Sequence, residues 1–350
     1  MSRADGPVES PHLAARRAKA KVDRLERDFG SSHPHTLLAR RVLASKVASS
    51  GGPALARDQI GELLPAMAGV FGPEHPETLL TRRFYARWLW SSGRRDEARS
   101  LMDQLCHTFE RVLGATHRDT LKVRWYQAGW IGESGDPSAA RDAAKELLRD
   151  TAEALGPFDP DTLWTRSQVI YWTGCSGDHP GALAAARILV ADTARELGTH
   201  HLVCLTARSN LAQWVYRSGD EAEAIGLMES LAADAESTLG LLDVKTLMDR
   251  HALAVWVGRA GEHRRARDLL APTVECLTAM FGPTYFRTVI ARNNLAAYSD
   301  LCGETEAAQE QLVVLVEDLE RELGADHAHT ATARRNLGRL QRRVTRPATG

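Results

Sequence analysis

The sequence has almost no excess charge of either sign. Its 44 Lys and Arg residues face 45 Asp and Glu residues, which gives a formal net charge of −1. Proteins that bind nucleic acid or anionic membranes through their overall charge are strongly basic, so this balance disfavours both classes of partner. Long hydrophobic runs are also missing, and the N-terminal stretch MSRADGPVESPHLAARR contains no apolar segment of the secretion-signal type. We therefore expect a cytoplasmic protein without membrane spans.

Cysteine is sparse and the familiar catalytic motifs are absent. The five cysteines are scattered and never stand in a CxxC spacing, which predicts reduced thiols and no disulfide framework. No GxSxG, HExxH or glycine-rich phosphate loop occurs, so we expect neither an enzyme nor a cofactor. The stretches at His200-His201-x-x-Cys204 and at His327-Ala-His329 lack a second pair of ligands, and we expect no metal site. The preference for Arg, Ala and Gly hints at a GC-rich bacterial genome.

What the sequence does contain is a repeat, because one glycine returns every 42 residues without insertion or deletion. A fixed period between roughly 20 and 50 residues is typical of a solenoid, and it overrides a domain count made from length alone. Counted as offsets from this anchor glycine, threonine recurs at offset 6, arginine at offset 10, a second glycine at offset 21 and alanine at offset 26. The anchor glycines are Gly30, Gly72, Gly114, Gly156, Gly198, Gly240, Gly282 and Gly324.

Each repeat is predicted to form two antiparallel helices. In GPFDPDTL, Asp159 suits the cap position of the first helix, Pro160 its first turn, and Asp161 the positive end of the helix dipole. The second glycine suits the end of that helix, and the small alanine at offset 26 lets the second helix approach closely. We expect about 16 helices in one solenoid at 10–343, made of a half-repeat at 10–30, seven full repeats at 31–324 and a capping helix at 325–343. The ends, 1–9 and 344–350, are expected to be disordered.

The small residues at offsets 14, 21 and 26 resemble the pattern of tetratricopeptide repeats. The 42-residue length, the opening G-x-x-H-P-x-T and the NLA triplets that begin at Asn210 and Asn294 are similar to the kinesin light chain variety. The resemblance covers residues 10–343 and implies an all-α, right-handed superhelical solenoid whose first helices line a concave groove for peptides or partner proteins. It also implies that Asn210 and Asn294, at offset 12, help to hold a ligand backbone. Arginine at offset 10 departs from the family pattern, in which an aromatic residue is usual.

The arginines at offset 10 fall in the middle of the apolar stripe when the first helix is drawn as a wheel. In one interpretation the arginine stem packs between repeats while the guanidinium bonds a loop carbonyl or an acidic side chain. In the other, the arginines form a row of cations for an acidic ligand. We favour packing, because a ligand rarely needs all eight copies. These residues are Arg40, Arg82, Arg124, Arg166, Arg208, Arg250, Arg292 and Arg334.

The tryptophans divide into a repeating and a non-repeating group. The repeating group falls at offset 16, beside the leucines of the stripe, and we predict that these rings pack between first helices. Trp90, Trp125 and Trp164 do not repeat, and the wheel places them opposite the stripe. The repeating residues are Trp88, Trp130, Trp172, Trp214 and Trp256.

Four further residues share the sector opposite the stripe: Arg83, Arg87, Tyr171 and Tyr216. Exposed aromatic residues mixed with arginine are typical of interaction hot spots, so we predict a partner-binding patch in repeats two to five. The alternative is that some of these rings pack under neighbouring helices. Later repeats place residues such as Ser209, Gln213 and Asn293 in this sector, which predicts a groove that is aromatic toward the N-terminal half and polar toward the C-terminal half.

The sequence therefore predicts a non-catalytic scaffold or adaptor that binds a peptide or helix of a partner protein in the concave groove. A peptide-sensing regulatory module that acts through a separate effector protein would use the same groove. An RNA-binding helical repeat is the third class, and the neutral charge balance disfavours it. The sequence does not identify the partner, the pathway or the oligomeric state.

Overall fold

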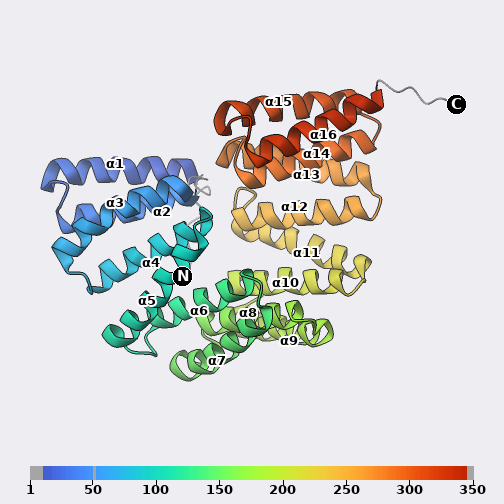
Figure 1. Ribbon diagram of the computed structural model, residues 1–350. Coiled ribbons are helices and arrows are strands. Elements are labelled where there is room, and N and C mark those ends of the chain that lie inside the picture. The colour runs from blue at the N-terminus through green and yellow to red at the C-terminus, as the bar shows by residue number, and fades with distance from the viewer. Residues whose placement is uncertain (1–10, 50–52, 345–350) are drawn as a thin grey trace. The chain divides into compact units, whose positions relative to one another are not determined.

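The computed structural model describes residues 11–49 and 53–344 (Figure 1). In that part of the chain, sixteen α-helices follow one another, and the repeat begins at the even-numbered, first helices. The first helices are α2 (Pro34–Ser49), α4 (Pro76–Ser91), α6 (Arg118–Glu133), α8 (Pro160–Cys175), α10 (Leu202–Arg217), α12 (Val244–Arg259), α14 (Phe286–Leu301) and α16 (Ala328–Val344). The second helices are α1 (Pro11–Phe29), α3 (Pro53–Phe71), α5 (Arg95–Leu113), α7 (Pro137–Leu155), α9 (His179–Leu197), α11 (Glu221–Leu239), α13 (His263–Phe281) and α15 (Thr305–Leu323).

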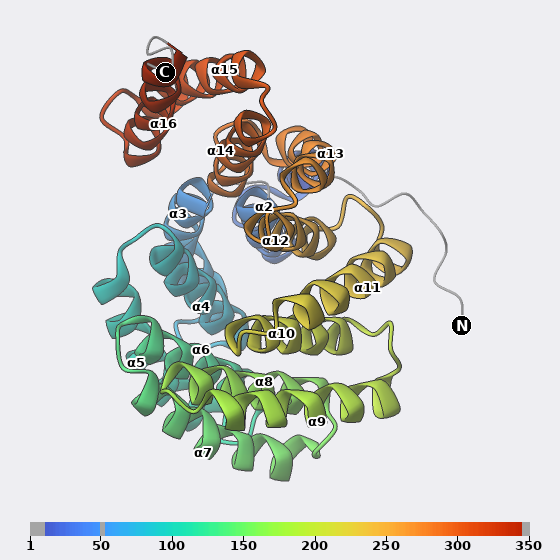
Figure 2. The same cartoon turned by 90° about the vertical axis from the view of Figure 1, so that its right-hand side faces the viewer.

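The helices pack in two compact units, α1–α10 at Pro11–Asp220 and α11–α16 from Glu221 onward. Inside each unit every helix contacts the next one along the chain, and first helices of adjacent repeats also touch, as α6, α8 and α10 do in one unit and α12, α14 and α16 in the other (Figures 1 and 2). The expected all-α solenoid of antiparallel helix pairs is confirmed. The expected disordered segment 1–9 and residues 345–350 of the expected tail at 344–350 lie outside the described residues, whereas Val344 is the last residue of α16.

The helix ends follow the local chemistry of the repeat. At the start of α8 the Asp159 carboxylate accepts a hydrogen bond from the Asp161 amide at 2.9 Å, and at the start of α4 the His75 ring nitrogen accepts one from the Glu77 amide at 3.2 Å. These bonds satisfy amide groups that the first turn of a helix leaves free. The anchor glycine Gly156 has φ of +97°, in the left-handed region that disfavours any side chain, which explains why glycine returns at this offset.

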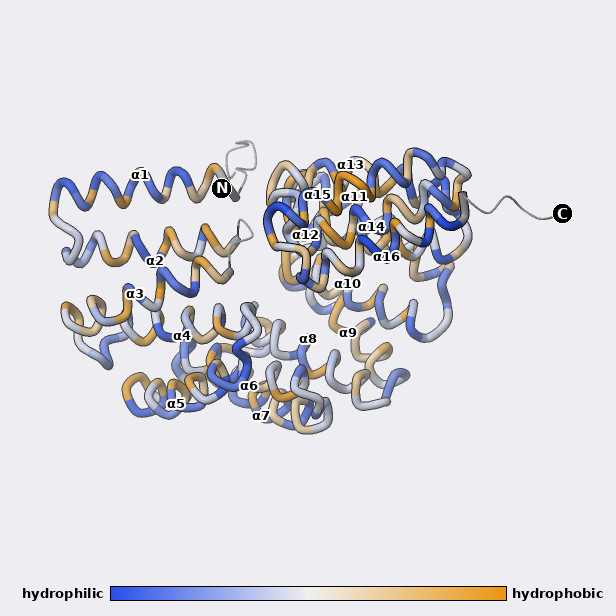
Figure 3. Tube along the Cα trace, turned by 45° about the horizontal axis from the view of Figure 1, so that its top comes forward, coloured by the Kyte–Doolittle hydropathy of each residue, from blue (hydrophilic) through white to orange (hydrophobic). Residues whose placement is uncertain are grey.

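The alanine and threonine columns form the contacts between helices. The alanines at offset 26 are fully buried from Ala56 to Ala308, so the close approach of the two helices in a pair is confirmed. Threonine at offset 6 is buried as well. In some repeats its hydroxyl donates to a carbonyl of the preceding second helix, as Thr162 does to Thr151 at 3.2 Å and Thr78 to Met67 at 3.2 Å, and in others to the anchor glycine, as Thr120 does to Gly114 at 2.8 Å. Figure 3 shows the resulting alternation of hydrophobic and hydrophilic residues along the helices.

The repeating tryptophans are core residues, with 3% to 8% of their surface exposed. Each of three aromatic rings at offset 16 lies against a glycine at offset 18 of the preceding repeat: Trp172 against Gly132, Trp214 against Gly174, and Tyr298 against Gly258. Because glycine has no side chain, the ring can pack directly on the neighbouring backbone. The predicted wedging of first helices by this column is confirmed.

Five arginines at offset 10 are ion-paired within the fold. Arg166 pairs with Asp192 at 2.6 Å and Arg292 with Asp318 at 2.8 Å, on the second helix of the same repeat. Where that helix lacks an acid at the matching position, the partner lies on the preceding second helix, as in the pair of Arg250 with Glu236 at 2.6 Å. This arrangement is the one that the packing interpretation expects. The remaining pairs are Arg124 with Asp150 and Arg334 with Glu320.

The histidines and cysteines singled out for metal chemistry have structural roles. The ring nitrogens of His201 and His327 accept amide hydrogen bonds at helix starts, and the five cysteines are unpaired. Burial raises the pKa of the Cys106 thiol to about 12. No group of three His, Cys, Asp or Glu residues in the described ranges is arranged to hold a metal ion, and no described helix is long and apolar enough to cross a membrane.

Candidate aromatic binding site

The candidate site lies within the unit Pro11–Asp220, on the first helices α4, α6, α8 and α10. Helix α8 contacts both α6 and α10 (Figure 2), so residues at matching offsets on these three helices are neighbours. Because the stripe at offsets 6, 13 and 16 is used for packing, residues near offsets 8, 11 and 15 remain for the opposite face. Trp164, Trp125 and Tyr171 stand at those offsets.

The larger of two adjoining cavities on this face has a volume of about 420 Å³. Its walls come from α4, α6, α8 and α10, and it brings together side chains from four consecutive repeats. Six of the predicted site residues line it: Arg87, Trp90, Trp125, Trp164, Tyr171 and Asn210.

The smaller cavity has a volume of about 300 Å³ and continues the same surface toward the start of α6 and α8. Trp125, Tyr126 and Trp164 line both cavities, so their rings form the floor that joins them. Arg83, a seventh predicted residue, lines the smaller cavity with Leu121. Sequence reasoning missed Tyr126 and Leu121. Tyr126 could have been found from its place beside Trp125, whose ring it meets edge-on at 5.3 Å.

Most charges around the smaller cavity are already neutralised. Arg83 forms an ion pair with Asp119 at 3.1 Å, and its side chain is only 13% exposed. Arg118 contacts Asp159 at 2.6 Å and Asp161 at 2.7 Å. These pairs join neighbouring repeats, and they leave little charge for an anionic ligand of that cavity.

Arg87 is the exception at the larger cavity. It is exposed, and in the described part of the chain no carboxylate forms an ion pair with it. Its guanidinium lies 4.9 Å from the ring centre of Trp88 and 6.0 Å from that of Tyr126, so two aromatic faces hold it. A partner carboxylate could therefore pair with Arg87 without breaking an existing ion pair.

Trp90 lines the larger cavity and also packs within the protein. Its ring stacks in parallel on Trp130, with 4.5 Å between ring centres, and its indole N–H donates to Glu133 at 2.8 Å. Trp90 stands at offset 18, the offset at which other repeats place glycine under the aromatic ring of the next repeat. Trp90 therefore follows the alternative prediction, in which an aromatic residue of the patch packs under a neighbouring helix.

The two predicted tyrosines lie in different surroundings. Tyr171 is 38% exposed at the larger cavity, its ring meets Trp172 edge-on at 4.8 Å, and burial raises the pKa of its phenol. Tyr216 is half-buried on α10 at offset 18 and is not among the residues that line either cavity.

The asparagines at offset 12 join adjacent first helices. The amide N–H of Asn210 donates to the Ser167 hydroxyl at 2.7 Å, and that of Asn294 lies 3.3 Å from the His251 ring nitrogen. Gln168 occupies the same offset and donates to the Trp125 carbonyl at 3.0 Å. Asn210 lines the larger cavity, whereas Asn294 belongs to the other unit and lines neither cavity.

Three buried polar atoms of residues that line the larger cavity have no hydrogen-bond partner among the described residues. These are the indole nitrogens of Trp125 and Trp172 and the side-chain oxygen of Gln168. All three are closed to solvent, so a ligand could reach them only if neighbouring side chains moved.

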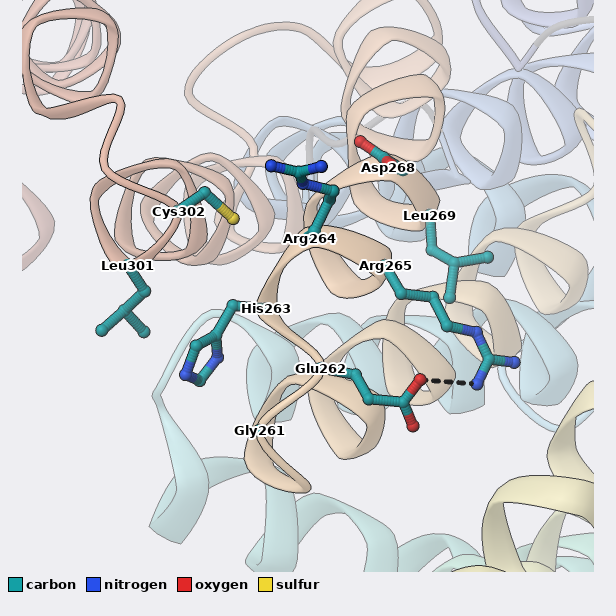
Figure 4. A pocket seen from close by; sticks show the side chains of 9 residues that line it. All are labelled: Gly261, Glu262, His263, Arg264, Arg265, Asp268, Leu269, Leu301 and Cys302. Carbon is teal, nitrogen blue, oxygen red and sulfur yellow. Dashed lines mark hydrogen bonds and ion pairs between the residues drawn. The ribbon is translucent and has the colours of Figure 1, made fainter.

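A separate hollow of about 710 Å³ lies in the unit from Glu221, at the start of α13. Its side chains diverge: His263 and Arg264 point to opposite sides, and Arg265 turns toward Glu262 at 3.2 Å (Figure 4). The hollow therefore lacks the convergent polar groups that a specific ligand site requires.

Comparisons with known proteins agree with this architecture. The family model described as tetratricopeptide repeat matches residues 79–119, which span most of α4 and all of α5. No curated protein matches the chain significantly. Among solved structures, yeast Tom70 aligns at a TM-score of 0.61 and 10% identity, covering 97% of this chain and 61% of Tom70.

Two further structures match over nearly the whole length of both chains. A Rap protein complexed with competence and sporulation factor aligns at a TM-score of 0.58 and 14% identity, covering 95% of this chain and 94% of Rap. NprR in complex with its cognate peptide NprX aligns at 0.55 and 11% identity, covering 96% of this chain and 94% of NprR. These likenesses concern the fold. The family match places a tetratricopeptide repeat at residues 79–119, and the structural likenesses show that the chain has the fold of tetratricopeptide-repeat solenoids.

Proposed function

We propose that the chain is a non-catalytic interaction module that binds a segment of a partner protein across α4, α6, α8 and α10. The observation that carries the proposal is the pair of joined cavities, of about 420 and 300 Å³, with Trp125, Tyr126 and Trp164 as their common floor. Volumes of this size match ligand pockets, which typically measure about 300 to 1,000 Å³. Aromatic rings supply large contact areas at a small cost in side-chain entropy, so they are frequent anchors for binding.

The distribution of charge and hydrogen-bonding groups favours a protein segment as the ligand. Arg87 is exposed and available to a carboxylate, and the side-chain amides of Asn210 and Gln168 line the same cavity. The predicted site residues Asn210, Arg83, Trp90 and Tyr171 would border this segment. Tyr216 and Asn294 are not part of the proposed site, because they line neither cavity.

A peptide-sensing regulatory role is the second candidate, and it uses the same site. The fold shared with NprR, a structure described in complex with its cognate peptide, supports it. Binding would then alter a separate effector protein. RNA binding is less favoured, because Arg83 and Arg118 at the smaller cavity are already paired with carboxylates.

The test uses a peptide chosen by the protein itself. Random peptides displayed on phage are selected on the full chain, and the best peptide is synthesised and titrated by calorimetry. We expect Trp125→Ala and Trp164→Ala each to weaken binding by about tenfold or more, since removal of a central aromatic anchor costs roughly 2 kcal/mol or more. Trp125→Phe should retain part of the affinity, because it keeps a ring but loses the indole N–H.

The matched control is Phe158→Ala, which removes an aromatic residue that is 38% exposed in the same unit but lies outside both cavities. Its affinity should equal that of the wild type. Equal affinity in Trp125→Ala, Trp164→Ala and the wild type would show that the peptide binds elsewhere and would refute the proposed site. Raising the salt concentration separates the classes, because RNA binding weakens steeply with salt and an aromatic peptide site only mildly.

A further inference from the structure

The unit from Glu221 exposes apolar side chains on its first helices. Val244 at the start of α12 is 40% exposed, and Phe286 and Ile290 on α14 are 46% and 44% exposed. Val244 and Phe286 share offset 4, while Met248 and Ile290 share offset 8, one helical turn further on. We call these four residues the Phe286 patch. Sequence analysis predicted a polar wall in this half, and the patch corrects that expectation at offsets 4 and 8.

Contacts between α12 and α14 make the patch one surface. The two helices pack against each other, and the Arg287 guanidinium on α14 reaches the Met248 sulfur on α12. The same guanidinium lies 5.2 Å from the centre of the Phe286 ring. Arg287 therefore sits between the apolar residues of both helices, and the patch combines two apolar rows with one cation.

Helix α14 lacks the side-chain hydrogen bond that caps the start of other first helices. Asp243 and His201, at the equivalent offset 3 of earlier repeats, accept a hydrogen bond from a backbone amide of the first helical turn. Tyr285 replaces them in α14 and makes no such bond. Its ring packs instead against Phe281 and Phe286, each with 4.8 Å between ring centres. Departures from a local stabilising rule are expected at functional sites, so the exposed Phe286 calls for a functional reason.

One cation beside the patch, Arg287, has no ion-pair partner among the described residues, whereas the neighbouring Lys245 is held by Asp249 at 2.7 Å. Asp249 is 4% exposed, so its charge is used inside the protein. Burial and the nearby Arg287 lower the pKa of His251, so that this histidine is neutral at pH 7. A partner with carboxylates would gain an ion pair with Arg287 at no loss of an existing one.

We propose that the Phe286 patch is a second docking surface and that it binds an acidic amphipathic helix of a partner protein. Packed helices lie roughly 8 to 10 Å apart, so the rows on α12 and α14 form two ridges between which the apolar face of a third helix fits. The partner's apolar side chains cover Phe286, Ile290 and Val244, and a Glu or Asp beside them pairs with Arg287. The proposal is separate from the aromatic site, because it involves other helices of another unit.

The experiment compares two synthetic helical peptides with the full chain by fluorescence anisotropy. Both carry leucines at the same i, i+3, i+4 and i+7 positions; one has glutamates at the flanking positions and the other lysines. We expect the acidic peptide to bind about tenfold more tightly than the basic one, since charge complementarity discriminates between partners. Equal binding of the two peptides, or no binding of the acidic one, would overturn the proposal.

Three variants assign the binding to the patch. Phe286→Ala and Ile290→Ser should each weaken binding of the acidic peptide several-fold. Arg287→Glu should make the chain bind the basic peptide more tightly than the acidic one. The control Leu323→Ala removes an apolar residue that is 39% exposed on α15 and should change nothing. Circular dichroism verifies folding, and the two independent apolar variants keep the test decisive if one of them folds poorly. Wild-type affinity in both refutes the patch.

Two additional measurements test whether the patch binds a second copy of the chain and whether the acidic peptide binds at the aromatic site instead. Sedimentation of the chain alone detects self-association, and a dimer that is lost in Phe286→Ala would identify a second copy as the occupant and overturn the acidic-helix proposal. Trp125→Ala should leave binding of the acidic peptide unchanged, because Trp125 lies in the other unit. Loss of binding in this variant would place the peptide at the aromatic site and refute the second surface.

Discussion

Because glycine and tryptophan of neighbouring repeats are in contact, we predict that replacing one such glycine by alanine lowers the free energy of unfolding, although this substitution in a helix usually raises it. Gly174, near the end of α8, lies directly under the ring of Trp214 on α10. A methyl group at position 174 would approach three ring carbons of Trp214 to within 3.0 Å. Trp214 is 3% exposed, so its ring has no free space into which it could move. Gly174→Ala must therefore distort the contact between the two repeats.

The magnitude follows from two opposed effects. Replacing glycine by alanine inside a helix ordinarily stabilises a protein by about 0.5 to 1 kcal/mol, and less near a helix end. Overpacking a filled core costs about 1 to 3 kcal/mol. We expect the second effect to win at Gly174 and the free energy of unfolding to fall by about 1 to 2 kcal/mol, the remainder after the helix-propensity gain.

The matched control is Gly69→Ala on α3 of the same unit. A methyl group there meets nothing within 4 Å, so only the helix-propensity effect remains. We expect this variant to be more stable than the wild type by about 0.5 to 1 kcal/mol. Because the two substitutions are chemically identical, the opposite signs isolate the contact with Trp214.

Thermal unfolding of the full chain, followed by circular dichroism, measures both variants. For a unit of this size, 1 kcal/mol corresponds to a Tm shift of about 2 to 4 °C. The Tm of Gly174→Ala should fall and that of Gly69→Ala should rise. A Gly174→Ala protein that melts at or above the wild-type temperature would show that the ring moves aside, and the proposed close packing of repeats would be wrong.

Two further predictions concern the second unit. Arg292→Ala should reduce the free energy of unfolding by about 1 kcal/mol in denaturant titrations, because it removes one of the two arginines that pair with the Asp318 carboxylate, 15% exposed, and leaves Arg321 as its partner; an unchanged free energy of unfolding would contradict the packing role. The pKa of His251 is below its ordinary value because of burial and Arg287. The unfolded chain therefore takes up this proton first, stability falls as the pH drops below about 6.5, and His251→Gln should flatten that part of the profile. An unchanged profile would refute the assignment.

The architecture could be predicted from the sequence alone because the same residue types recur at the same offsets and make the same contact in each repeat. Gly156 must occupy a left-handed conformation and Ala140 must fit between two helices, so the residue types identify the backbone geometry directly. The burial of Trp214 followed from its place beside the apolar stripe. The wheel also selected six residues that line the two cavities, which are Arg83, Arg87, Trp90, Trp125, Trp164 and Tyr171, and the family resemblance added Asn210.

Contacts between neighbouring repeats could not be read from a wheel, because a wheel describes one helix at a time. Trp90 was placed on the free face, and only the stacking of repeats shows that offset 18 lies against offset 16 of the next helix, on Trp130. The same limitation hid the bond from Asn210 to Ser167. The exposed Phe286 was overlooked because offset 4 was read as a helix start, where the other repeats carry residues such as proline.

The even spacing of the anchor glycines has a consequence for how such a chain can change in length. Every first helix in a unit meets its neighbours through the same offsets, so adding or deleting a whole period preserves each interface. A single residue inserted in the middle of α8 would instead rotate all later side chains of that helix by about 100° and turn Ile170 and Trp172 out of the core. The chain can therefore gain or lose complete repeats without damage to its core, whereas the insertion of a single residue disrupts it.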